Sequence, residues 1–163
     1  PNAGKSTLLS RISAAHPKIA DYPFTTLQPN LGIVKFGDFD SYVVADIPGL
    51  IEGAHAGKGL GIQFLRHIER TRVLVFMLDV TTPDAQADLE ILHGELNQFS
   101  PELLKKPSLL VATKIDLLPP EARRGPFLDG ATEISISSAT GEGLHALVHR
   151  IGALIQTARY ADG

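Results

Sequence analysis

The chain of 163 residues contains no cysteine, so it has no disulfide, no thiolate zinc site and no cysteine nucleophile. It also has no run of about 18 to 20 apolar residues, which is the length that a membrane-spanning helix requires. The opening residues carry no apolar run of the kind found in signal peptides. We therefore expect no membrane span and no secretory leader.

A surplus of positive charge is lacking as well. The 15 lysines and arginines are outnumbered by 18 aspartates and glutamates, which gives a formal net charge of −3. This balance argues against a broad basic surface for nucleic acid, and we expect no direct DNA binding. With 44% hydrophobic and 20% charged residues, the composition is that of a globular protein, and the length suits one domain, residues 1–163.

Apolar runs alternate with helical patterns along the chain. We predict strands at residues 31–36, 41–46, 73–80, 108–112 and 132–136, and helices at 5–15, 62–71, 83–99 and 143–158. Residues 16–30, 48–61 and 119–130 are rich in proline or glycine and are predicted to be irregular. The first two strands suit an antiparallel hairpin. The alternation as a whole predicts an α/β domain with a mainly parallel sheet and helices on both faces.

The first candidate motif is Gly4-Lys5-Ser6-Thr7, at the start of the first predicted helix. It matches the end of the phosphate-binding loop pattern G-x-x-x-x-G-K-[ST]; the first glycine and the preceding strand would come before Pro1. Backbone N–H groups there would hold phosphates, Lys5 would contact the β- and γ-phosphates, and Ser6 would ligate Mg²⁺. An ordinary helix start is the alternative interpretation of so short a match.

Two further motifs follow predicted strands. Asp46-Ile47-Pro48-Gly49 places a carboxylate for a Mg²⁺-bound water, and a glycine N–H for a γ-phosphate, at the end of an apolar run. Thr113-Lys114-Ile115-Asp116 places an aspartate that would accept hydrogen bonds from guanine N1–H and its amine. Taken singly, each motif is better explained as a strand that ends in a turn.

The fourth motif, Ser137-Ser138-Ala139, follows the last predicted strand, where backbone N–H groups would bind guanine O6. Serine-rich turns are common, so it carries little weight alone. All four motifs, however, follow in the order phosphate, magnesium and base, and three of them come at the carboxyl ends of predicted strands. Ligands of open α/β sheets bind at that edge, so the set predicts a nucleotide site.

The order of the motifs resembles that of Ras-like P-loop GTPases. Residues 20–27 (ADYPFTTL), 46–53 (DIPGLIEG) and 57–61 (GKGLG) resemble the Obg family, whose members are GTPases linked to the large ribosomal subunit. The resemblance covers essentially the whole chain. It implies a P-loop G domain that begins inside its phosphate-binding loop, with the first strand missing from this chain.

The resemblance also implies roles for individual residues. The nucleotide would be bound by the four motifs, by residues 1–3 before the first of them, and by residues 24–28, which belong to the first of two switch segments: Pro1, Asn2, Ala3, Gly4, Lys5, Ser6, Thr7, Phe24, Thr25, Thr26, Leu27, Gln28, Asp46, Ile47, Pro48, Gly49, Thr113, Lys114, Ile115, Asp116, Ser137, Ser138 and Ala139. Lys5, Thr26 and Gly49 would be catalytic. Mg²⁺ would be ligated by Ser6, Thr26 and Asp46. Asn2 adds potassium as a hypothetical second cation beside the phosphates.

Three residues depart from the usual pattern. Thr113 replaces the asparagine that usually begins the base motif, which predicts weaker guanine binding. Ser138 replaces alanine, a small change where only the backbone N–H is used. Leu50 stands where Ras-type enzymes place a water-orienting glutamine, a replacement that the Obg family shares, so intrinsic hydrolysis should be slow.

These observations lead to one function and several alternatives. The favoured function is Mg²⁺-dependent GTP binding and slow hydrolysis, acting as a cytoplasmic conformational switch in assembly of the large ribosomal subunit. A sensor of GDP, GTP or guanine alarmones with little hydrolysis is the main alternative. A neighbouring family of translation GTPases and an ATP-using protein also stay open, although Asp116 favours guanine.

Overall fold

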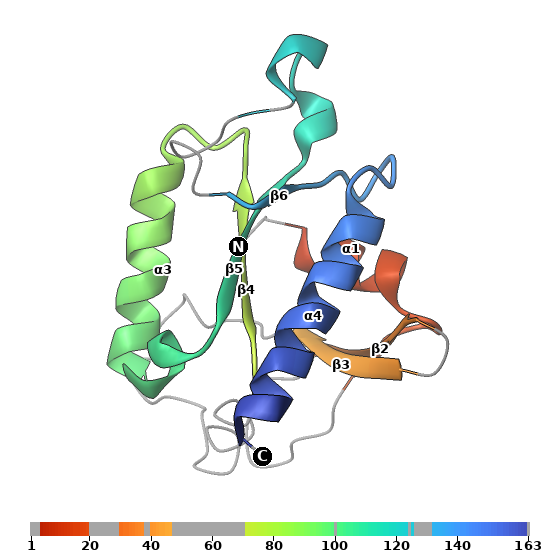
Figure 1. The fold of residues 1–163 in the computed structure, drawn as a ribbon. Helices are drawn as coiled ribbons and strands as arrows, with labels where there is room; N and C mark the ends of the chain where they lie inside the picture. Colours follow the sequence, from red (N-terminus) through yellow and green to blue (C-terminus); the bar gives the residue numbers. More distant parts are fainter. Residues whose placement is uncertain are drawn as a thin grey trace.

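The computed structural model describes residues 4–19, 30–37, 40–46, 71–99, 101–123, 125 and 132–162. The strands in these segments form two three-stranded sheets, one antiparallel and one parallel (Figure 1). The predicted α/β class is confirmed. The two sheets are separate because no described strand forms hydrogen bonds with strands of both sheets.

The antiparallel sheet contains β1 (Lys18–Ile19), β2 (Asn30–Phe36) and β3 (Asp40–Asp46) in that order. The predicted hairpin of β2 and β3 is confirmed, with Asn30 opposite Asp46 at its open end. The sequence analysis did not predict β1, because a strand of two residues is too short to show an alternating pattern. It lies in a segment that was predicted to be irregular.

The parallel sheet contains β4 (Leu74–Asp79), β5 (Ser108–Thr113) and β6 (Ile134–Ser135), with β5 in the centre. Asp79 pairs in register with Thr113, so β4 and β5 end at the same level. This register brings the segments that follow the two strands to one edge of the sheet.

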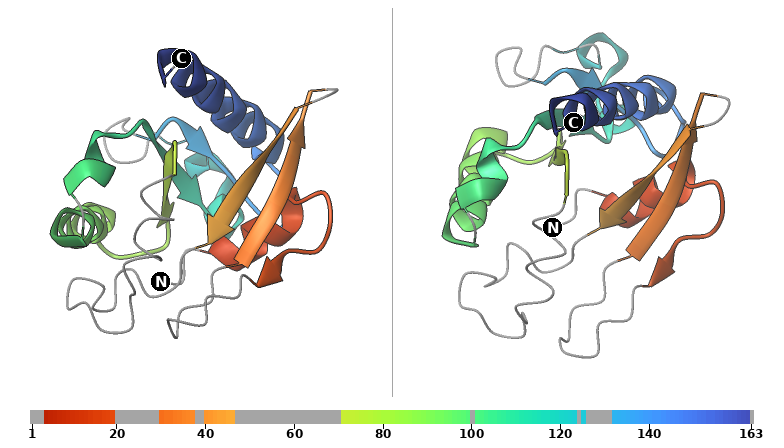
Figure 2. Two further views of the ribbon diagram at one scale, coloured as in Figure 1. Left: turned by 90° about the horizontal axis from the view of Figure 1, so that it is seen from below. Right: turned by 60° about the horizontal axis from the view of Figure 1, so that its bottom comes forward.

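The described helices include three α-helices, α1 (Lys5–Ile12), α3 (Ala85–Phe99) and α4 (Leu144–Asp162), and the 3₁₀ turns η2 (Pro101–Lys105), η3 (Ile115–Leu117) and η4 (Pro120–Ala122). α1 is shorter than predicted because the backbone of Ser13 is extended, with φ −73° and ψ 142°. α3 and α4 lie on opposite sides of the parallel sheet (Figure 2). Phe76 of β4 contacts His93 of α3, whereas Met77 packs against the core beneath α4, so alternate residues of this strand serve the two faces.

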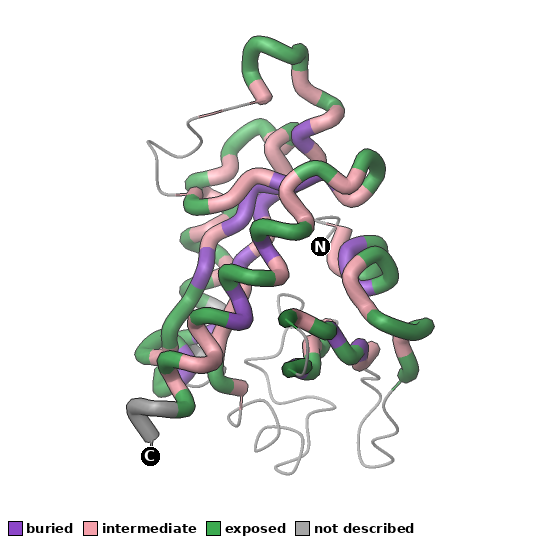
Figure 3. The backbone as a smooth tube through the Cα atoms, turned by 45° about the vertical axis from the view of Figure 1, so that its right-hand side comes forward, coloured by how far each residue is buried: buried purple, intermediate pink, exposed green. Residues whose placement is uncertain are grey.

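One apolar core joins the two sheets beneath α4. Figure 3 shows where buried residues lie along the backbone. Its buried members come from both sheets, from the segment after β6 and from two helices: Leu8, Val34, Tyr42, Leu109, Val111, Ile136, Leu147 and Ile151. The Tyr42 hydroxyl adds a polar link, because it donates a hydrogen bond of 2.8 Å to the Val148 carbonyl of α4. Burial also raises the pKa of Tyr42, so its hydroxyl remains a donor. In the described part of the chain, no helix is both long and apolar enough to cross a membrane.

Two glycines allow this packing to be tested. A Cβ added to Gly143, which has φ +78°, would lie 2.2 Å from the Ser135 carbonyl oxygen, whereas one added to Gly94 of α3 would meet no atom within 4 Å. We expect Gly143→Ala to lower the free energy of unfolding by about 1–3 kcal/mol. Gly94→Ala should raise it by about 0.5–1 kcal/mol, because alanine favours the helix. Urea unfolding would measure the free energy of unfolding of both variants. A Gly143→Ala variant as stable as the wild type would contradict the close approach between Gly143 and Ser135.

Candidate functional site

The described end of the phosphate-loop motif leads directly into α1. Gly4 has a left-handed backbone, with φ 84°, and its carbonyl accepts the first helical hydrogen bond, from Leu8 N–H at 2.9 Å. Lys5 and Ser6 are therefore in the first turn, where backbone N–H groups lack helical partners and attract anions. The first turn contains no acidic side chain that would repel a phosphate.

Asp46, the last residue of β3, connects the second motif to the first. Ser6 Oγ donates a hydrogen bond of 3.0 Å to Asp46 Oδ2, and Lys5 Nζ lies 3.2 Å from Asp46 Oδ1. The Asp46 side chain is 9% exposed. Its Oδ1 atom has no hydrogen-bond partner among the described residues, so Lys5 is close enough for an ion pair but lacks hydrogen-bond geometry.

This arrangement suits a hard divalent cation. A hydroxyl and a carboxylate lie side by side at a helix N-terminus, and one carboxylate oxygen is buried without a hydrogen bond. Mg²⁺ prefers oxygen ligands of this kind, usually together with phosphate oxygens and water. Ser6 and Asp46 therefore fit the magnesium role predicted for them.

The base motif begins in the sheet and leaves it through a strained residue. Thr113 ends β5 with 3% exposure, and its hydroxyl donates to the Leu78 carbonyl at 3.2 Å. Lys114 follows with φ 62°, the one positive φ at a non-glycine residue in the described segments. Ile115 is buried, and its N–H donates to the Ile136 carbonyl at 3.3 Å. That bond ties the base motif to the segment that carries the fourth motif.

Asp116 and Ser137 join the third and fourth motifs directly. The buried Ser137 hydroxyl donates to Asp116 Oδ1 at 2.8 Å and accepts from the Thr140 N–H at 3.1 Å. Arg123 also donates to the Asp116 backbone carbonyl, at 3.1 Å. The carboxylate thus has a fixed orientation, and Ser138 and Ala139 form the turn beside it.

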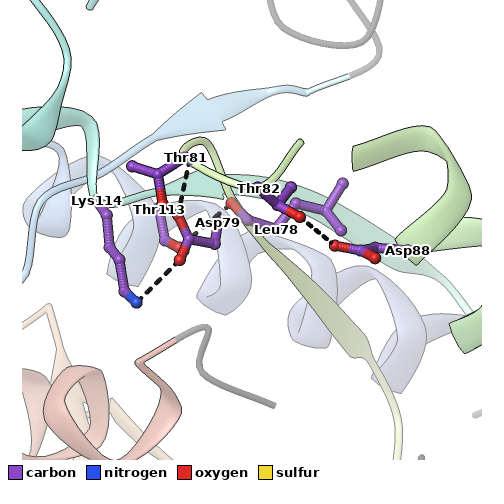
Figure 4. Close-up of polar contacts among 7 residues, drawn as sticks. All are labelled: Leu78, Asp79, Thr81, Thr82, Asp88, Thr113 and Lys114. Atoms are coloured by element: carbon purple, nitrogen blue, oxygen red, sulfur yellow. Dashed lines mark hydrogen bonds and ion pairs between the residues drawn. The ribbon is translucent and has the colours of Figure 1, made fainter. Parts of the chain in front are cut away.

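The sequence analysis missed Asp79, the last residue of β4. Its Oδ2 atom accepts from Lys114 Nζ at 2.9 Å, and its Oδ1 atom accepts from the N–H and hydroxyl of Thr81 at 2.8 and 2.6 Å (Figure 4). Burial alone would raise the pKa of Asp79, but these hydrogen bonds and the charge of Lys114 lower it below its usual value. An acidic residue at the end of an apolar strand, as at Asp46, was the signal available in the sequence.

The predicted motifs therefore meet in space where the structure describes them. Lys114 provides the link between the first and third motifs, since a Cβ placed on Gly4 would lie 3.9 Å from Lys114 Cε. The described members of the predicted set are residues 4–7, 46, 113–116 and 137–139. The other predicted residues, 1–3, 24–28 and 47–49, lie outside the described residues.

Solved structures with a similar fold include domains of FeoB proteins. The G domain of the T. maritima FeoB iron transporter superposes with a TM-score of 0.66 at 22% identity, covering 95% of this chain and 93% of that one. The cytosolic domain of L. pneumophila FeoB has a TM-score of 0.68 at 18% identity, covering 94% and 65%. At these identities the likeness establishes the fold, that of a P-loop G domain.

Curated relatives are far closer in sequence. GTPase Obg of Chlorobaculum tepidum is 57% identical over 147 residues, which are 90% of this chain and 44% of the relative. GTPase Obg of Solibacter usitatus is 58% identical over 157 residues, covering 91% and 47%. The chain thus spans less than half the length of these relatives. The profile of the family described as "50S ribosome-binding GTPase" matches residues 1–114. The resemblance noted in the sequence is confirmed, and the chain belongs to the Obg family of GTPases.

Proposed function

We propose that this protein binds GTP with Mg²⁺, hydrolyses it slowly, and acts as a cytoplasmic switch in assembly of the large ribosomal subunit. The observation that carries the proposal is that described members of the four motifs contact one another across the two sheets. Ser6 contacts Asp46, Ser137 contacts Asp116, and Lys114 lies against Gly4. The ribosomal part is supported by the description of the matching family, a 50S ribosome-binding GTPase.

The base would be selected by Asp116. Ser137 holds one of its carboxylate oxygens, which orients the group to accept hydrogen bonds from guanine N1–H and the exocyclic amine. Adenine offers no such donor pair, so an adenine nucleotide would leave the carboxylate without these partners.

The phosphates would lie over the first turn of α1. Lys5 would supply positive charge there, and Ser6 and Asp46 would hold Mg²⁺, which offsets phosphate charge when bound. Thr26 and Gly49 are proposed to respond to the γ-phosphate as the two switch contacts, and Asn2 to hold a potassium ion. Leu50 offers no polar group to orient water, which supports slow intrinsic turnover.

Base selection is tested by replacing Asp116. In the full-length protein with Mg²⁺, we expect GDP to bind much more tightly than ADP. Asp116→Ala should weaken GDP binding by roughly 30-fold or more, because guanine loses charge-assisted hydrogen bonds. Asp40→Ala is the matched control, since Asp40 lies at the opposite end of β3 from the site. Calorimetric titration would measure the affinities of the wild type and both variants for GDP and ADP. Equal binding of GDP and ADP by the wild type would contradict the proposal.

The magnesium role of Asp46 is tested by comparing it with Asp40, at the other end of β3. Asp46→Asn should reduce the difference in GDP affinity between buffers with Mg²⁺ and with a chelator by about tenfold, because an amide is a weaker Mg²⁺ ligand than a carboxylate. Asp40→Asn should leave that difference unchanged. The same dependence on Mg²⁺ in both variants would remove Asp46 from the metal site.

The rate of GTP hydrolysis tests the proposed role as a conformational switch. The purified protein should hydrolyse GTP well below about 1 s⁻¹, the low end of typical kinase turnover, and faster with large ribosomal subunits. No acceleration by the subunits would instead favour a nucleotide sensor. The same assay in potassium and sodium buffers tests Asn2, since equal rates would remove the potassium hypothesis.

A further inference from the structure

The carboxylate of Asp79 is held on both oxygens by residues around the base motif. Thr81 binds Oδ1 through its N–H and hydroxyl, and Lys114 binds Oδ2 through its ammonium group (Figure 4). The pairing of Asp79 with Thr113 across β4 and β5 fixes the distance between the carboxylate and the start of the base motif. Asp79 is therefore a rigid anchor at the strand ends.

Lys114 is the residue that this anchor restrains. Its left-handed backbone is unfavourable for a residue with a Cβ, and such strain usually persists where function requires one conformation. Its side chain is 35% exposed and runs beside Gly4, between the base motif and the phosphate loop. A flexible lysine in that place would lose rotamer freedom on binding a nucleotide, whereas an anchored lysine has already lost it.

We infer that Asp79 is a positioning residue for guanine nucleotide binding, acting through Lys114. It holds the lysine stem across the site and engages the ammonium group, so that the nucleotide meets an ordered side chain. The inference rests on the proposed function, because it assigns a role at the same site. Stability alone is a poor explanation for the pair, because partly exposed ion pairs contribute little to it.

Asp79→Asn isolates the contact with Lys114. The amide oxygen would still accept from Thr81, but the amide nitrogen would face the ammonium group. We expect the dissociation constant for GDP to rise about 3- to 10-fold. Asp88→Asn is the matched control, because Asp88, in the first turn of α3, accepts a hydrogen bond of 2.8 Å from Thr82 in the connection between β4 and α3. It should change GDP affinity by less than about twofold.

A double-mutant cycle separates positioning from a structural role. Lys114→Met keeps a long side chain without the ammonium group, so Asp79→Asn should have no further effect on GDP affinity in that background. The thermal unfolding midpoint of each variant should shift by only a few degrees.

A loss of GDP affinity that persists with Lys114→Met, or tighter GDP binding by Asp79→Asn, would overturn the inference. So would unchanged GDP affinity in Asp79→Asn while the wild type binds GDP. A wild type that binds no GDP would overturn the proposed function with it.

Discussion

The apolar core beneath α4 is the contact on which the site depends. Val34 and Tyr42 belong to the antiparallel sheet and Leu109 and Val111 to the parallel sheet, yet all four belong to one cluster together with Leu147 of α4. The described strands of the two sheets share no ladder of hydrogen bonds. Burial of this apolar surface therefore sets how the antiparallel sheet, which carries Asp46, lies relative to the parallel sheet, which leads to Asp116.

Charge is concentrated where these parts meet. Asp46 has one carboxylate oxygen buried without a hydrogen bond, and Lys5 approaches it without completing one. Asp79, in contrast, has partners for both oxygens. An oxygen that has an ion pair but no hydrogen bond keeps room for a further cation ligand, whereas a fully bonded carboxylate serves to hold its neighbours in place. The two acidic strand ends therefore suit different tasks, metal binding at Asp46 and positioning at Asp79.

Much of the site could be predicted because the motifs are local. The glycine, lysine and serine of residues 4–6 specify a helix start by themselves, and an acidic residue after an apolar run marks a strand end. The β2–β3 hairpin was predicted because two strand patterns follow each other with only a short connection between them. Three features could not be predicted. β1 is too short to show a period, the end of α1 depends on the extended backbone at Ser13, and the role of Asp79 depends on strand register.

The sequence by itself determined the family and the order of the motifs, since both are carried by short runs of neighbouring residues. It also determined that Thr113 replaces the usual asparagine. Only the tertiary structure decided which side chains touch: Ser6 with Asp46, Ser137 with Asp116, and Lys114 with Asp79. These pairs are 21 to 40 residues apart, and their contacts depend on strand register, on a left-handed residue and on a shared core. Such long-range geometry arises from packing, which no local pattern encodes.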